Sequence, residues 1–133
     1  MFRLVKVLNS NNQCETVRLN SNASLQIGKG CCLTCTNGAL AFPTAAQAPD
    51  YIALIGSDEC ADTVGRIDVM IVTENMVFKT EYSGSVTPFV GMPVGLATVQ
   101  NKMDAVTYNS GGKGTVIGVE DDKKSVYVRF NKS

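Results

Sequence analysis

Short runs in which apolar and polar residues alternate recur along this chain of 133 residues, and polar or glycine-containing turns separate them. In the last run, residues 125–130, Val126, Val128 and Phe130 fall on one face and Tyr127 falls on the other. A repeat of two residues is typical of a half-buried β-strand, because successive side chains of a strand point to opposite faces. This alternation predicts an all-β fold.

The spacing of the runs predicts a compact antiparallel β-sandwich or small barrel of about nine to ten short strands, with little or no helix. Asn37-Gly38 stands between two such runs and is the strongest short signal for a hairpin. Residues 66–72 and 76–82 flank a short polar turn and indicate a second hairpin. Residues 51–55 are apolar throughout, which predicts a strand buried on both faces.

The length of the chain predicts one β-rich domain over residues 1–133, since a chain of this size buries roughly two-thirds of the surface that its unfolded form exposes. The hydrophobic fraction of 44% and the charged fraction of 18% exclude a disordered chain. Residues 83–93 contain two glycines and two prolines, and they are the place where the chain would divide if it formed two domains. The pieces on either side would be small for independent cores.

Histidine is absent, and 12 basic side chains balance 12 acidic ones. The chain therefore lacks the usual general base, the usual partner of a serine or cysteine nucleophile, and the commonest metal ligand. It also lacks the basic excess that phosphate contacts require of most nucleic-acid binders. We expect a protein that is not an enzyme and has no cofactor, and nucleic acid is a disfavoured partner.

Five cysteines raise the question of a metal site, because Cys32 and Cys35 have the spacing of a zinc knuckle. A structural zinc site needs four ligands, and Cys14 and Cys60 would complete the set only by converging in space. On a strand, Cys35 would share a face with Cys31 while Cys32 pointed to the other side. We interpret these cysteines as small buried hydrophobes, reduced as in most cytosolic proteins, and predict no metal.

Two further motifs are interpreted as ordinary loops. Residues 111–115, Gly-Gly-Lys-Gly-Thr, lack the spaced glycines of a phosphate-binding loop and precede a strand pattern rather than a helix, so a flexible hairpin loop is expected. Asp58, Glu59 and Asp62 lie in one segment without the spacing of a calcium-binding EF-hand loop, and are interpreted as a solvated acidic loop.

Charged residues interrupt the first eight residues, which excludes the apolar core of a signal peptide there. No apolar run approaches the ~20 residues of a membrane-spanning helix. We expect a soluble protein that is made in the cytosol and has no membrane partner.

The order of strands and turns from residue 25 to residue 130 resembles the small β-rich decoration, or cement, proteins of tailed-bacteriophage capsids. The similarity rests on residues 49–53, then 66–73 after an acidic loop, then 76–80, and on the closing strand 126–130. It implies a structural protein of the virion, made in the host cytoplasm, that binds the major capsid protein on the outside of the shell and stabilises the particle. Self-association is a further implied option.

In families of this kind, termini and long loops make the contacts, which here implies residues 1–8, 43–50 and 83–93. The candidate contact residues are Phe2, Phe89, Val90 and Met92. Phe89 and Met92 have an equally good alternative place in the core of the domain. Two other functions stay open, a small nucleic-acid- or ligand-binding barrel and another virion component such as a head-completion or tail protein.

Overall fold

The computed structural model of this protein describes residues 1–8, 15–20, 26–56, 66–100 and 102–132. Within these residues the chain forms eleven β-strands and no helix, which confirms the predicted all-β class. The strands are β1 (Arg3–Val7), β2 (Thr16–Asn20), β3 (Cys32–Thr36), β4 (Ala39–Ala41), β5 (Tyr51–Ala53), β6 (Arg66–Ile71), β7 (Met76–Tyr82), β8 (Pro93–Val99), β9 (Lys102–Tyr108), β10 (Gly114–Val119) and β11 (Ser125–Phe130).

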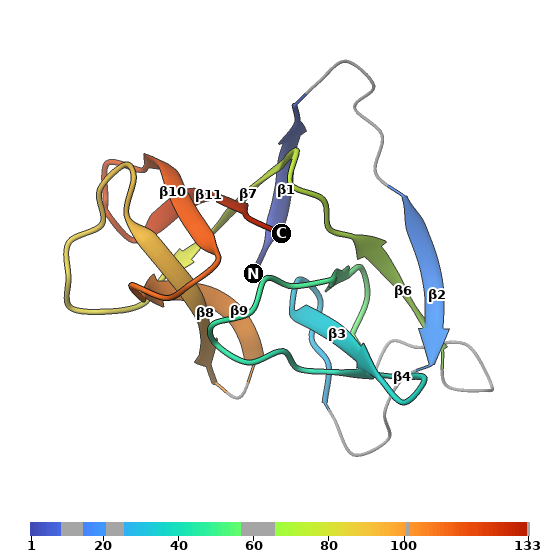
Figure 1. The fold of residues 1–133 in the computed structure, drawn as a ribbon. Coiled ribbons are helices and arrows are strands. Elements are labelled where there is room, and N and C mark those ends of the chain that lie inside the picture. The colour runs from blue at the N-terminus through green and yellow to red at the C-terminus, as the bar shows by residue number, and fades with distance from the viewer. Residues whose placement is uncertain (9–14, 21–25, 57–65, 101, 133) are drawn as a thin grey trace.

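Five strands close into a small barrel in the order β7-β11-β10-β8-β9, and β9 returns to pair with β7 (Figure 1). The closing pair is parallel, with Glu81 opposite Ala105 and Tyr82 opposite Val106, whereas the other pairings are antiparallel. Closure removes the free edges that an open sheet would expose. β1 adds to the outside of this ring by pairing antiparallel with β7.

The other five strands form a second sheet in the order β2-β6-β5-β3-β4. Its β3–β4 hairpin confirms the prediction from Asn37-Gly38, and both turn residues have the positive φ that a tight hairpin turn requires, 52° and 82°. β2 and β4 are the two ends of the sheet, and the Asn20 side chain donates a hydrogen bond to the carbonyl oxygen of Gly38. The sheet is therefore curled, with its two ends near one another.

The predicted hairpin of residues 66–72 and 76–82 is wrong, because the two segments belong to different sheets. β6 pairs with β2 and β5, while β7 pairs with β1, β11 and β9. The predicted turn between the two segments is present, since the Met76 N–H donates to the Thr73 carbonyl oxygen. The polar residues of this turn therefore carry the chain from one sheet to the other.

A continuous apolar core joins the barrel to the second sheet. Its centre is a group of three aromatic rings from Phe2, Phe78 and Phe130, with ring centroids 5.9–6.2 Å apart. The second sheet contributes Cys32, Ile52 and Met70 to the same cluster.

A second, smaller cluster lies on the other side of the second sheet and includes Leu33, Ala53 and Val69. β5 is thus covered on both faces, as predicted, because Ile52 packs into the first cluster and Ala53 into the second. The segment of residues 83–93, where the sequence marks a split, connects β7 to β8, and both strands belong to the same closed barrel, so a division there would separate strands of one ring.

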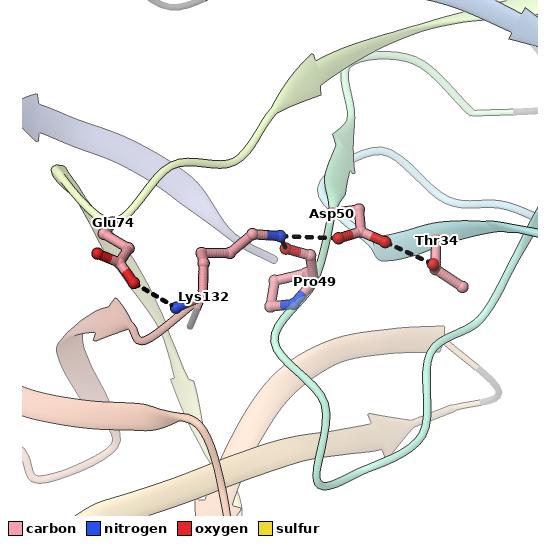
Figure 2. Close-up of polar contacts among 5 residues, drawn as sticks. All are labelled: Thr34, Pro49, Asp50, Glu74 and Lys132. Atoms are coloured by element: carbon pink, nitrogen blue, oxygen red, sulfur yellow. Dashed lines mark hydrogen bonds and ion pairs between the residues drawn. The ribbon is translucent and has the colours of Figure 1, made fainter.

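Polar contacts also tie the C-terminal end of the chain to the second sheet (Figure 2). The Lys132 ammonium group donates to Asp50 Oδ1 and to the Pro49 carbonyl oxygen, each at 2.8 Å, and Asp50 Oδ2 accepts a hydrogen bond from the Thr34 hydroxyl at 2.6 Å. The Lys132 backbone N–H donates to Glu74 Oε1 at 2.7 Å. We call Thr34, Asp50, Glu74 and Lys132 the C-terminal clasp.

Candidate interaction surface

The loop between β7 and β8 exposes three large apolar side chains close together in the sequence. Val86 is 43% exposed, Phe89 52% and Val90 67%, the largest exposed fraction among the exposed large hydrophobic residues of the described chain. These three residues are called the apolar tip. Single exposed hydrophobic residues are ordinary on protein surfaces, but a group of them on one loop marks a candidate interaction site.

A tight turn holds two residues of the apolar tip, Phe89 and Val90, against the barrel. The Met92 N–H donates to the Phe89 carbonyl oxygen at 3.1 Å, and Gly91 has a φ of 93°. A positive φ at the third residue of a hydrogen-bonded turn is the mark of a type II turn, and glycine adopts it without strain. The turn directs Val90 outward, while Met92 at its base is fully buried.

Hydrogen bonds fix this turn to the neighbouring strand β10. The Gly91 N–H donates to the Val116 carbonyl oxygen at 2.8 Å, and the Val116 N–H donates to the Met92 carbonyl oxygen at 3.0 Å. Gly91 and Met92 thus both lie opposite Val116, an arrangement that is a β-bulge with a glycine of positive φ at its first position. Ile117, 39% exposed, directly follows Val116 on β10, so it is next to the residue to which the turn carrying Phe89 and Val90 is bonded.

A shallow hollow of about 340 Å³ continues the surface from Ile117 across the outer face of β10 and β11. Thr115, Ile117 and Arg129 line its strand face, and Glu74, Phe130 and Asn131 complete it. The Arg129 guanidinium donates through Nε and Nη2 to the Glu74 carbonyl oxygen, at 3.2 and 2.9 Å, which fixes the position of its positive charge. The exposed apolar side chains of the tip are thus accompanied by a hollow of mixed lining, in which Ile117 and Phe130 are apolar and Arg129 carries a fixed positive charge. An apolar anchor with polar groups around it is the usual composition of an interface.

The structure separates the four contact residues expected from the sequence into two pairs. Phe89 and Val90 lie exposed on the apolar tip. Phe2 and Met92 are buried, at 3% and 0% exposure, so neither presents an exposed side chain to a partner, and Met92 takes the alternative place in the core. Phe2 fills the aromatic centre of the core, and the turn at Gly91 folds Met92 inward.

Two residues of this surface were not singled out by the sequence pattern. Val86 belongs to the expected contact loop, but nothing in its local sequence separates it from a buried valine. The exposure of Ile117 could have been predicted from the sequence. Ile117 alternates with Val116, which is buried, and an apolar residue on the outer face of an amphipathic strand is unusual.

The cysteines of the described residues divide into two kinds. Cys31 and Cys32 are fully buried, and burial raises the pKa of both thiols above the ordinary value. Cys32 and Leu33 enter different core clusters, which confirms that they point to opposite faces of β3. Cys35 is exposed and is therefore no buried hydrophobe. Cys14, Cys60 and the acidic loop of residues 58–62 lie outside the described residues.

Among the residues that the structure describes, no three histidine, cysteine, aspartate or glutamate side chains lie close enough to hold a metal ion together. The same part of the chain contains no helix long and apolar enough to cross a membrane. Comparison with models of known protein families gives no match. Comparison with curated proteins gives no match either.

Proposed function

We propose that this protein is a non-catalytic binding domain of a virion, which decorates the outside of a tailed-phage capsid by docking on the major capsid protein. The observation that carries the docking part is the apolar tip, in which the exposed side chains of Phe89 and Val90 stand on a turn that is hydrogen-bonded to the barrel and Val86 is exposed earlier in the same loop. The capsid part rests on the resemblance in strand order between residues 25 and 130.

A rigid apolar tip suits a binding role for a physical reason. An anchor that is already held in place loses little conformational freedom on binding, so more of its burial contributes to affinity. Here the turn at Gly91 and the pairing with Val116 hold Phe89 and Val90 before any partner arrives. Phe89 would fill a pocket on the partner, while Ile117 and the hollow that contains the Arg129 guanidinium would form the rim.

Mass spectrometry of purified virions from the phage whose genome encodes this chain tests the proposal. We expect the protein in the particles at a copy number comparable with that of the major capsid protein. A copy number small enough for a single ring would point to a head-completion or tail component and contradict the decoration role. Absence from the particles, with abundance in the infected cytosol, would contradict any virion role.

A further inference from the structure

A second apolar surface, lined by no residue of the apolar tip, lies between β1 and the second sheet. It is a crevice of about 290 Å³, lined almost entirely by apolar atoms. The apolar side chains that line it come from the start of the chain, from β1, and from the ends of β5 and β6: Met1, Phe2, Leu4, Ile52, Leu54 and Met70. A crevice of this volume has about ten times the ~30 Å³ that one water molecule occupies in the liquid, so it has room for an apolar side chain.

The open side of strand β1 faces this crevice. In the described part of the chain β1 pairs with β7 alone, so it is the edge strand of its sheet (Figure 1). Just before β1, the Phe2 N–H donates to the carbonyl oxygen of Gly30, and Gly30 in turn donates to Ala53. Gly30 and Ala53 also line the crevice. An edge strand with one neighbour offers a row of backbone N–H and C=O groups to an added strand.

The charged side chains that line the crevice are positive, although the Met1 ammonium at its edge lies 3.8 Å from the carboxylates of Glu81 and Asp104. Arg3 and Lys29 line it, Lys6 follows on β1, and all three side chains are exposed. No aspartate or glutamate of the described residues is among the lining residues. A segment that fits this surface therefore carries apolar side chains for the crevice and carboxylates for its rim.

The same charges disfavour a second copy of this chain as the occupant. Two antiparallel β1 strands would bring Arg3 and Lys6 of one copy close to Arg3 and Lys6 of the other. Like charges opposite one another across a strand pair are destabilising. The occupant that the charges favour is an acidic segment of a different protein.

We propose that β1 and its crevice form a strand-addition site for an extended segment of a partner protein, about five residues long, in which apolar residues alternate with aspartate or glutamate. The added strand would hydrogen-bond to the open edge of β1. Its apolar side chains would enter the crevice, and its carboxylates would lie beside Arg3 and Lys29. Backbone hydrogen bonds supply affinity in this mode of recognition, and pockets for alternate side chains supply specificity. This site does not depend on the capsid role proposed above.

The test uses the full-length protein and a synthetic library of hexapeptides in which valine, leucine, isoleucine or phenylalanine alternates with aspartate or glutamate. A matched library carries lysine in place of the acids. We expect members of the acidic library to bind and the lysine library to fail. Hydrogen exchange of the bound protein should show new protection of the backbone amides of β1.

Two changes distinguish strand addition from binding in an apolar pocket alone. N-methylation of alternate amides on the bound edge of a selected peptide should weaken binding at least tenfold, because it removes the backbone donors. Two single substitutions, Arg3→Glu and Lys29→Glu, should each weaken binding of the acidic peptides several-fold. They are made in separate variants, so the test stands if only one of the variants folds. Lys113→Glu changes an exposed lysine that does not line the crevice and should bind as the unmodified protein does.

The proposal is overturned if no acidic peptide binds, or if binding is indifferent to N-methylation, which would indicate an apolar pocket without strand pairing. Equal binding of the lysine library, or protection that maps to residues 83–92 instead of β1, would overturn it too. Self-association of the free protein that Arg3→Glu strengthens would assign the edge to a second copy and also contradict it.

Discussion

Lys132 Nζ lies 2.8 Å from Oδ1 of Asp50, so the residue two positions after the last barrel strand is joined to the residue just before β5 of the second sheet. The lysine side chain is 23% exposed and the aspartate side chain 50%, so the ion pair is partly open to solvent. Together with Thr34 and Glu74, it connects the barrel and the second sheet by polar contacts in addition to the shared apolar core.

Removing the Lys132 ammonium group should destabilise the protein modestly. We expect Lys132→Met to lower the free energy of unfolding by roughly 1 kcal/mol, because the methionine keeps most of the apolar stem but loses two hydrogen bonds, one of them to a partly exposed carboxylate. Chemical denaturation measures the change. Lys124→Met, at an exposed position in the turn before β11 and away from the clasp, is the matched control and should cost little. Equal effects of the two substitutions would show that the clasp contributes nothing.

The contribution of Asp50 should depend on pH. Partial burial opposes ionisation of this carboxyl, but hydrogen bonds from Lys132 and Thr34 and the charge of Lys132 outweigh it, so its pKa lies below the ordinary value. A carboxyl with a lowered pKa in the folded state stabilises above its unfolded-state pKa of about 3.9, and this stability is lost as the pH falls through the folded pKa.

We therefore expect the difference in unfolding free energy between the unmodified protein and Asp50→Asn to be largest near pH 7 and to shrink below about pH 4. Denaturant titrations at a series of pH values measure it. A difference that stays constant from pH 7 to pH 3 would mean that the charge of Asp50 has no role.

Much of the strand pattern, and part of the interaction surface, could be predicted from the sequence because local features determine them. The alternation in residues 125–130 follows from a strand with one buried face, and the Asn37-Gly38 hairpin follows from two residues that tolerate positive φ. The pairing of β7 could not be predicted in this way. The residues of its partner β1 come 69 to 76 residues earlier in the chain, and the short turn before β7 is equally compatible with a hairpin and with a crossing between sheets.

Burial within loops could not be predicted from the sequence either. Phe89 and Met92 are both apolar residues of one loop, and no periodicity distinguishes them. Only the turn centred on Val90 and Gly91, with its hydrogen bonds to Val116, decides that Phe89 is exposed and Met92 is buried. The open edge of β1 could not be predicted from the sequence for a similar reason. Whether a strand lies at an edge depends on which distant strands pair with it.

The thiols should differ sharply in reactivity. Cys35 is exposed, whereas Cys31 and Cys32 are buried with raised pKa values, and the thiolate is the form that reacts. In a background of Cys14→Ser and Cys60→Ser, we expect one thiol to react rapidly with an aromatic disulfide reagent and two to react only after denaturation. Absorbance of the released thiol counts them. Rapid reaction of all three in the folded protein would contradict the burial of Cys31 and Cys32.

The turn that presents the apolar tip should require glycine at position 91. A Cβ at Gly91 meets no atom within 4 Å, so the cost of Gly91→Ala comes from its φ of 93° alone. We expect a loss of about 1 kcal/mol in unfolding free energy, the usual cost of a non-glycine residue in such a conformation. Gly111→Ala is the control, since its φ is not in the positive region and a Cβ there makes an ordinary contact at 3.7 Å. Thermal unfolding measures the stability of both variants. If the two variants were equally stable, the backbone at Gly91 would carry no strain and the prediction would be wrong.

Cosedimentation of the protein with purified capsids that lack it measures directly whether the apolar tip docks on the capsid. We predict that the unmodified protein binds and that Phe89→Ser combined with Val90→Ser weakens binding at least tenfold, because loss of a buried interface anchor costs about 2 kcal/mol or more and each 1.4 kcal/mol is a factor of ten. Val5→Ser, at an exposed valine on β1, should bind normally. Undiminished binding by the double variant, or no binding by the unmodified protein, would contradict docking through the apolar tip.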